Sequence, residues 1–253
     1  MMLTAALSIY LILTAVQVPF SEGCKTAVEL YDKGTLSVDP GEKERNFIKA
    51  APLCSDPEVL SRVYNNLADV YETEGEFSRA LHYYRKAIGV KKDLSTPYIS
   101  VGDIFYKLGD YYSSYVMYGK GLVYNPGLPE AIISRRSAQE GRDRKIVIYF
   151  DIDSFKLPDR YMPRLQHVIG VLSDDKNRRV EITGHTCDLG DAAYNRRLSE
   201  RRAAAAKEYL KTHTALDDNK ITVRGMGEDK PLLANKDRDS RTLNRRIEVI
   251  IKE

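Results

Sequence analysis

A periodicity of 34 residues in the first half of the chain constrains the fold more than any other sequence feature. When residues 61–94 are aligned with residues 95–128, large apolar residues fall opposite large ones and small residues opposite small ones. The aligned pairs include Tyr64 with Tyr98, Ala68 with Gly102, Tyr71 with Phe105, Gly75 with Gly109, and Tyr84 with Tyr118. Small residues allow paired helices to approach closely, and each glycine is placed to end a first helix. The pattern predicts two consecutive helix–turn–helix units.

This repeat resembles the tetratricopeptide repeat, a two-helix unit of the same length. A degenerate earlier copy runs from about Ala27 to Ala51, and a helix from Pro129 to Gln139 is expected to cap the last repeat. We therefore expect an all-α tetratricopeptide solenoid over residues 24–136 and a polar linker at residues 137–144. The resemblance implies that a concave groove of the solenoid binds a protein partner, which the sequence does not identify.

Tyrosine is concentrated in this solenoid, which holds 12 of the 17 tyrosines in the chain. Those at repeat positions are expected to pack between helices. Four others fall outside the repeat positions and are candidates for the groove or its edge. They are Tyr106, Tyr111, Tyr112 and Tyr115.

The chain has three cysteines, and in an exported protein an odd count implies one pair with one free thiol, or no pair. Cys24 begins the degenerate repeat and Cys54 ends it. In a helical hairpin, the start of the first helix lies near the end of the second. This placement predicts a disulfide between Cys24 and Cys54. The alternatives are two unpaired thiols or a lipid on Cys24.

The first 21 residues carry no ionised side chain, and residues 3–20 are mostly apolar. The pattern predicts a secretory signal peptide over residues 1–23, with the small residues Ser21 and Gly23 before Cys24. No Lys or Arg precedes the apolar run, however, and the run is long enough to remain as a membrane anchor. Membrane association through this segment, by a retained helix or a lipidated Cys24, therefore stays open.

The second half of the chain alternates strand and helix patterns, which predicts a sheet with helices packed on it. Strands are expected at residues 146–152, 180–182, 220–224 and 244–252, helices at 165–172 and 191–213, and a charged loop at 228–239. On the long helix, Asn195 and Arg202 are seven residues apart and share a face. An amide and a planar guanidinium beside a strand-to-helix turn make a plausible carboxylate receptor.

Four stretches of this half resemble, in order, the C-terminal OmpA-like peptidoglycan-binding domain. They are Tyr149–Ser154, Gly184–Ala203, Arg224–Glu228 and Asn244–Glu248. The resemblance covers residues 145–253 and implies an α/β sandwich of a mixed sheet and helices. With the solenoid, this gives a two-domain α+β protein.

The resemblance also implies the ligand, a diaminopimelate residue of the peptidoglycan stem peptide, bound without a covalent bond. The arginine that matches Arg202 clamps a ligand carboxylate in the family, and we expect Arg202 to be semi-exposed at a pocket rim. Thr186 and Asn195 also match the family pocket. Arg245, in the Asn-Arg-Arg motif, orients the site, pairs with an acidic neighbour or supports the fold.

The sequence departs from the family motif at one position. The aspartate that takes the ligand amine in the family falls here on Cys187, and a carboxylate follows one residue later at Asp188. A thiol is a weak acceptor and cannot replace a carboxylate against an ammonium group. Either Asp188 serves on a rotated turn, or the amine contact is lost; because consecutive side chains diverge, we favour the second account.

The remaining features exclude other functions. With 39 basic and 36 acidic residues the net charge is +3, which does not point to nucleic acid. No nucleophile elbow, Walker loop, dinucleotide fingerprint or zinc-spaced cysteine pair is present, so we expect no enzyme, cofactor or metal site. Asp151 and Asp153 flank the end of a strand and are interpreted as turn or cap residues rather than as catalytic carboxylates.

The sequence therefore predicts a periplasmic protein associated with the cell wall or outer membrane of a Gram-negative-type bacterium. It would bind peptidoglycan through the OmpA-like domain and a protein through the repeats. The alternative is a protein-interaction scaffold whose OmpA-like domain no longer binds the wall.

Overall fold

The computed structural model describes residues 21–175 and 177–252. The predicted signal peptide lies outside the described residues as far as position 20, and its last residues begin helix α1 (Glu22–Leu36), which Ser21 caps. Within the described part of the chain, no helix is both long enough and apolar enough to cross a membrane.

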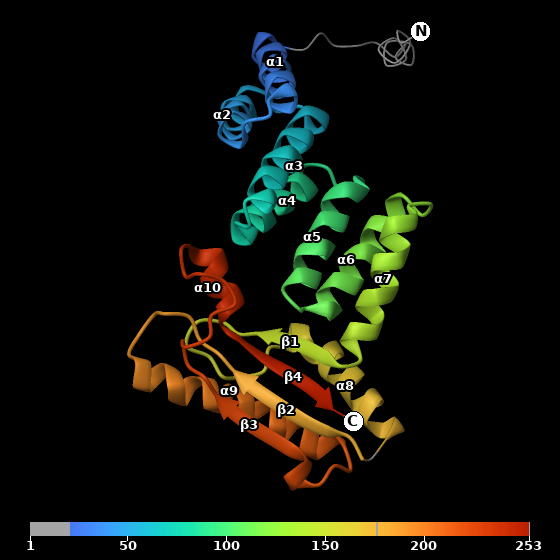
Figure 1. Ribbon diagram of the computed structural model, residues 1–253, viewed down its shortest axis with the longest axis vertical. Helices are drawn as coiled ribbons and strands as arrows, with labels where there is room; N and C mark the ends of the chain where they lie inside the picture. The colour runs from blue at the N-terminus through green and yellow to red at the C-terminus, as the bar shows by residue number, and fades with distance from the viewer. Residues whose placement is uncertain (1–20, 176, 253) are drawn as a thin grey trace.

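The first half of the chain is a row of paired helices (Figure 1), which confirms the predicted solenoid. Its elements are α1, α2 (Pro40–Ala50), η1 (Ala51–Leu53), α3 (Pro57–Thr73), α4 (Phe77–Val90), α5 (Ser95–Lys107), α6 (Tyr111–Tyr124) and α7 (Pro129–Arg142). Gly75 and Gly109 follow the first helix of each repeat with φ of 75° and 73°, values that favour glycine. The repeat sequence therefore sets where these helices end.

The tyrosines at repeat positions pack between the helices. Tyr71, Tyr84 and Tyr118 are buried, and each hydroxyl donates a hydrogen bond to a carboxylate, of Glu44, Glu72 and Asp103 respectively. Such partners are required because a buried hydroxyl without one costs free energy.

Three of the four groove candidates also serve in packing. Tyr111 faces Gly141 on α7, Tyr112 lies under the Arg164 guanidinium, and Tyr115 lies under Arg135. Tyr106 remains 40% exposed, and a role of the four tyrosines in a groove or at its edge stays a prediction.

A disulfide joins Cys24, near the start of α1, to Cys54, which follows η1. It closes the first pair of helices into a loop with a sequence separation of 30 residues. Cys187 is a free, buried thiol.

The second half contains a four-stranded mixed sheet, as predicted, in the order β1-β4-β2-β3. The strands are β1 (Lys145–Tyr149), β2 (Arg179–Gly184), β3 (Ile221–Gly225) and β4 (Arg246–Lys252), and of the neighbouring pairs only β2–β3 is parallel. Helices α8 (Met162–Asp174) and α9 (Ala192–His213) cover one face. Short 3₁₀ turns lie at Asp159–Tyr161 and Asp218–Lys220.

Helix α10 (Arg238–Asn244) lies where the sequence predicted the end of a charged loop and the start of the last strand. Asp237 caps it, because its carboxylate accepts from the Ser240 backbone N–H while the Ser240 hydroxyl accepts from the Asp237 N–H. This capping box fixes a helix of seven residues, which is too short for hydrophobic periodicity to reveal it.

The predicted linker at 137–144 is wrong, because α7 continues through Arg142 and only two residues separate it from β1. The face of the sheet away from α9 packs on the repeats, and Val147 and Tyr149 belong to the same core as the repeat helices. Arg164 of α8 reaches into this interface, where it pairs at 3.0 Å with the fully buried Asp110. The two halves therefore share a continuous interface.

Candidate functional site

A pocket of about 280 Å³ lies where the chain leaves β1 and β2 and enters α9. Strand β2 and α9 are in close contact next to it, because a Cβ added to Gly184 would lie 2.0 Å from the Ser199 carbonyl oxygen. Only glycine allows this approach. The lining residues are Ile152, Asp153, Thr186, Cys187, Leu189, Gly190, Tyr194, Asn195, Leu198, Arg202 and Arg245.

Arg202 lies deep in the protein beside this pocket and is 0% exposed, so the expectation of a semi-exposed rim residue is wrong. Its Nε donates to the Ser154 carbonyl at 2.7 Å, and its two terminal nitrogens donate to the His185 and Asp151 carbonyls at 3.1 and 3.2 Å. Burial lowers the pKa of Arg202 to about 10, and the neighbouring Arg245 adds to the effect. At neutral pH the guanidinium is still charged.

These bonds use part of the donor capacity of Arg202. A guanidinium has five N–H donors, one on Nε and two on each terminal nitrogen. The three hydrogen bonds leave one donor on each terminal nitrogen without a partner among the described residues. The side chain is therefore held rigidly by backbone while it retains capacity for a ligand anion at the pocket.

Thr186 and Cys187 are both buried in the pocket wall. The Thr186 Oγ1 has no hydrogen-bond partner among the described residues although it is buried. Buried hydroxyls are normally paired, so this one has unused capacity toward whatever enters the pocket.

Asn195 was expected to contact the ligand, but its amide nitrogen is engaged within the protein. It donates to the Leu189 carbonyl at 3.2 Å and to the Glu228 carboxylate at 2.6 Å, and it approaches the Cys187 carbonyl at 3.4 Å. Asn195 lines the pocket and fastens the loop after β2 to α9.

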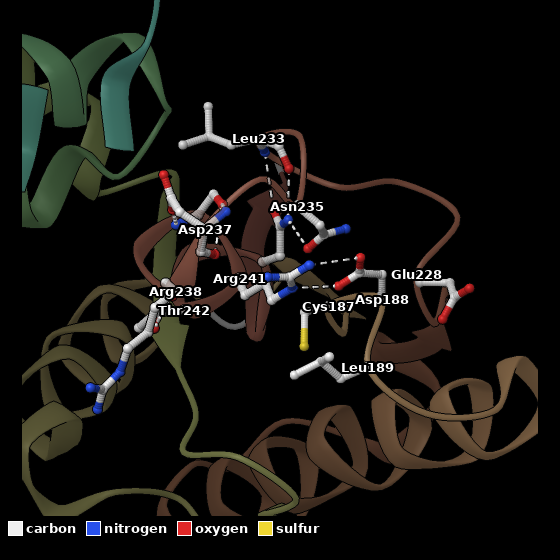
Figure 2. Close-up of polar contacts among 12 residues, drawn as sticks. Cys187, Asp188, Leu189, Glu228, Leu233, Asn235, Asp237, Arg238, Arg241 and Thr242 are labelled. Carbon is white, nitrogen blue, oxygen red and sulfur yellow. Dashed lines mark hydrogen bonds and ion pairs between the residues drawn. The ribbon is translucent and has the colours of Figure 1, made fainter. Parts of the chain in front are cut away.

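Asp188 is absent from the pocket lining, in contrast to Cys187. Its carboxylate meets the Arg241 guanidinium through two contacts, at 2.8 and 3.3 Å (Figure 2). The hydrogen bond from Arg241 lowers the pKa of Asp188, which keeps the carboxylate ionised. The turn is therefore not rotated to bring Asp188 inward, and loss of the amine contact at Cys187 stays a prediction.

Arg245 supports the fold around the pocket, whereas a role in orienting the site stays a prediction. Its Nε donates to the Phe150 carbonyl at 3.2 Å and one terminal nitrogen donates to the Thr242 hydroxyl at 3.0 Å, so it ties together the chain segments around the pocket. Its side chain also lines the pocket.

Sequence reasoning missed Asp153 as a pocket residue. Among the described residues that line the pocket, Asp153 is the one with a carboxylate. Its backbone has φ of 55°, unusual for a residue other than glycine, and its carboxylate accepts a hydrogen bond from the Tyr194 hydroxyl. That hydrogen bond is the main reason why the pKa of Tyr194 is raised. Asp151, by contrast, pairs with Arg160 outside the pocket.

The pocket combines buried guanidinium groups with a carboxylate and a free hydroxyl, an arrangement that suits a small zwitterionic ligand. Within residues 21–175 and 177–252, the pocket included, no three His, Cys, Asp or Glu side chains lie close enough together to hold a metal ion.

Two family models match parts of the chain. The model of the OmpA family matches residues 149–245, and a tetratricopeptide repeat model matches residues 61–94.

Curated relatives match about two fifths of the chain. A protein of Gloeobacter violaceus named photosystem I P700 chlorophyll a apoprotein A2 is 40% identical over 113 residues, which is 42% of this chain and 13% of that protein. Outer membrane protein Omp38 of Acinetobacter baumannii is 31% identical over 108 residues, 43% of this chain and 30% of that protein. The peptidoglycan-associated lipoprotein of Buchnera aphidicola is 29% identical over 103 residues, 41% of this chain and 59% of that protein. In each case the match spans less than two thirds of the relative.

Proposed function

We propose that this chain is a cell-envelope protein that binds peptidoglycan without a covalent bond. The premise is that residues 149–245 match the OmpA family and residues 61–94 match a tetratricopeptide repeat. It would act in the periplasm, at the cell wall or outer membrane of a Gram-negative-type bacterium, and bind a second protein through the repeats. The names of the relatives in Acinetobacter and Buchnera support this location. The Cys24–Cys54 disulfide suits an oxidising compartment.

The observation that carries the proposal is the state of Arg202. Three backbone carbonyls hold its guanidinium in place, and its terminal nitrogens still have donors to offer at the pocket. A preorganised guanidinium binds a carboxylate without a large loss of side-chain entropy. The carboxylate of a diaminopimelate side chain is the proposed ligand group, and the unpaired Thr186 hydroxyl would be a second donor to it.

The ligand amine would contact Asp153. This carboxylate lines the pocket, whereas the residue at the family's amine-binding position is the thiol of Cys187. Asp153 is also more exposed than Cys187, and its carboxylate already accepts a hydrogen bond from the Tyr194 hydroxyl. Both features weaken an ammonium contact, so the proposed site would favour the carboxylate of the ligand over its amine.

Sedimentation with purified sacculi tests the proposal. The wild-type chain should pellet with sacculi, and Arg202→Lys should pellet much less, because a point charge cannot satisfy three carbonyls and a ligand carboxylate together. Arg197→Lys is the matched control, since Arg197 is exposed on the same helix. Thermal unfolding of each variant separates a lost ligand contact from a lost fold. A wild-type chain that stays in the supernatant would overturn the proposal.

The second candidate is a scaffold that uses only its repeats. Cys187 is the observation in its favour, because the family's carboxylate is missing there. In that case the folded wild-type chain would not pellet with sacculi under any salt condition, and a Cys187→Asp variant would.

A further inference from the structure

The loop that forms one wall of the pocket, residues 186–190 (the pocket loop), is held from outside the pocket by α10 (Figure 2). Arg241 Nε lies 2.8 Å from Asp188 Oδ1, and Arg241 Nη2 lies 3.3 Å from Asp188 Oδ2. A two-point contact between planar groups fixes orientation as well as position. It holds Asp188 away from the pocket while the adjacent Cys187 stays in the pocket wall.

The same helix supports a second part of the pocket. Thr242 follows Arg241 on α10, and its hydroxyl accepts a hydrogen bond from Arg245 at 3.0 Å. Because Arg245 lines the pocket, α10 holds both the pocket loop and one of its guanidinium groups.

Helix α10 is in turn fixed to the tetratricopeptide domain, and Figure 1 shows it between the sheet and α4. The Ser78 hydroxyl of α4 donates to the Asp237 carboxylate at 2.8 Å, and the His82 Nδ1 lies 3.5 Å from the Asp239 carboxylate. Leu243 of α10 belongs to the hydrophobic core of the repeats. A continuous series of contacts thus leads from α4 through α10 to the pocket loop.

We propose that Arg241 is a positioning residue for the pocket and that the tetratricopeptide domain, through α10, sets the affinity of the pocket for its ligand. The identity of the ligand rests on the proposed function. A loop already held in place loses little conformational freedom when a ligand binds. The Arg241–Asp188 ion pair, called the brace below, therefore raises the affinity without touching the ligand. The repeats would then have a second role, as a structural part of the wall-binding site.

The first test removes the brace in the full chain. Arg241→Gln should bind a soluble diaminopimelate-containing muropeptide about two- to fivefold more weakly, the range expected for a partly exposed ion pair. Amide hydrogen exchange of the pocket loop should become faster in the same variant. Arg241→Lys should lie between Arg241→Gln and the wild type. Arg238→Gln is the matched control, because Arg238 lies on the same helix and its side chain is directed away from Asp188 in Figure 2.

The partner residue provides an internal check. Asp188→Asn should weaken binding to a similar extent, and the Arg241→Gln, Asp188→Asn double variant should lose no more than either single variant, because the two changes remove one interaction. Losses that simply add would overturn the assignment of Arg241.

The second test addresses the repeats. A Ser78→Ala, His82→Ala variant should show the same two effects at a smaller size, and Arg85→Ala, an exposed change on α4, should show neither. If Arg241→Gln behaves as Arg238→Gln does, the brace is refuted. If the Ser78→Ala, His82→Ala variant matches the wild type, the contribution of the repeats is refuted. A wild-type chain that does not bind the muropeptide would overturn the proposed ligand, whereas the exchange measurements would still decide the brace.

Discussion

The hydroxyl of Thr186 is buried and unpaired, so a substitution that removes it should change ligand affinity without lowering the stability of the fold. Thr186→Val replaces the hydroxyl with a methyl group of similar size, and no protein hydrogen bond is lost. We expect the free energy of unfolding to stay the same or rise by about 1 kcal/mol, because a buried group no longer lacks a partner. Muropeptide affinity should fall, since the ligand loses a donor. Urea unfolding and titration calorimetry on one preparation measure both; a stability loss above about 1 kcal/mol would contradict this description of Thr186.

Cys187 offers a gain-of-function prediction. Cys187→Asp places a carboxylate in the pocket wall where the family motif has one, close enough to Arg202 and Arg241 for charge interaction. A charge-assisted hydrogen bond contributes about 1.5–3 kcal/mol, so affinity for the muropeptide should rise roughly ten- to a hundredfold. Asp188→Ala should have the smaller effect. Equal affinity of Cys187→Asp and wild type would show that Asp153 already holds the amine fully.

At this scale the sequence predicted which side chains would surround the pocket better than it predicted their partners. Arg202 was recognisable from motif and helical spacing, but its burial depends on carbonyls of residues 151, 154 and 185, which the chain brings together only in the folded state. Asp188 and Arg241 are 53 positions apart, and no local pattern links them. The sequence did not reveal Asp153 as a pocket residue, because its place in the pocket depends on a backbone angle that residue type alone does not indicate.

Among the elements, β2 and α9 pack closely together, and residues that follow or belong to them line the pocket. Gly184→Ala would place a methyl group 2.0 Å from the Ser199 carbonyl oxygen, so the helix must move off the strand. We expect a loss of about 3 kcal/mol or more in the free energy of unfolding, together with loss of ligand binding. Gly170→Ala on α8 is the control, because nothing lies within 4 Å of its added Cβ and alanine favours a helix. Thermal unfolding of the two variants should shift in opposite directions.

Long or repeated elements were predictable from the sequence, whereas α10 and the end of α7 were not. The repeat and the four strands leave periodic signals over many residues. Helix α10 depends on a capping box and on α4 for support, and residues 137–142 are polar yet helical because α7 packs on α6. In both segments the helix depends on tertiary contacts, which a local sequence pattern does not reveal.

On the scale of the molecule, the buried pair of Arg164 and Asp110 links the two halves. Arg164→Met would leave Asp110, which is fully buried, without its cation at a cost of about 3–5 kcal/mol. We expect the wild type to unfold in one calorimetric transition and the variant to unfold in two, as the interface fails before either core. A single, merely shifted transition in the variant would mean that the shared hydrophobic core alone couples the halves.

A charged cluster on the sheet face near the repeats predicts loss of stability in acid. Burial lowers the pKa of His185 from 6.5 to about 4, and Arg246 and Lys145 lower the pKa of Glu248 even though burial alone would raise it. Both groups bind protons more readily in the unfolded chain, so their contribution is complete above about pH 6.5 and is lost as the pH falls through 6.5 toward 4 and below.

Urea unfolding between pH 7 and pH 4 measures this loss, which we expect to be about 1–3 kcal/mol. His185→Asn should flatten the upper part of the pH profile. An unchanged slope in His185→Asn would assign the acid sensitivity to other groups.

The Cys24–Cys54 bond has a mechanical consequence. Helix α1 lies at the end of the molecule away from the sheet (Figure 1), so a protein held by the wall at its pocket and pulled from the start of α1 is loaded along its length. Tension that enters at the start of α1 reaches Cys24 within one helical turn and crosses the covalent bond to Cys54. The 29 residues between them are bypassed. The first helix pair would not peel away under load until the disulfide is reduced, so a reductant should lower the force at which the solenoid begins to unravel.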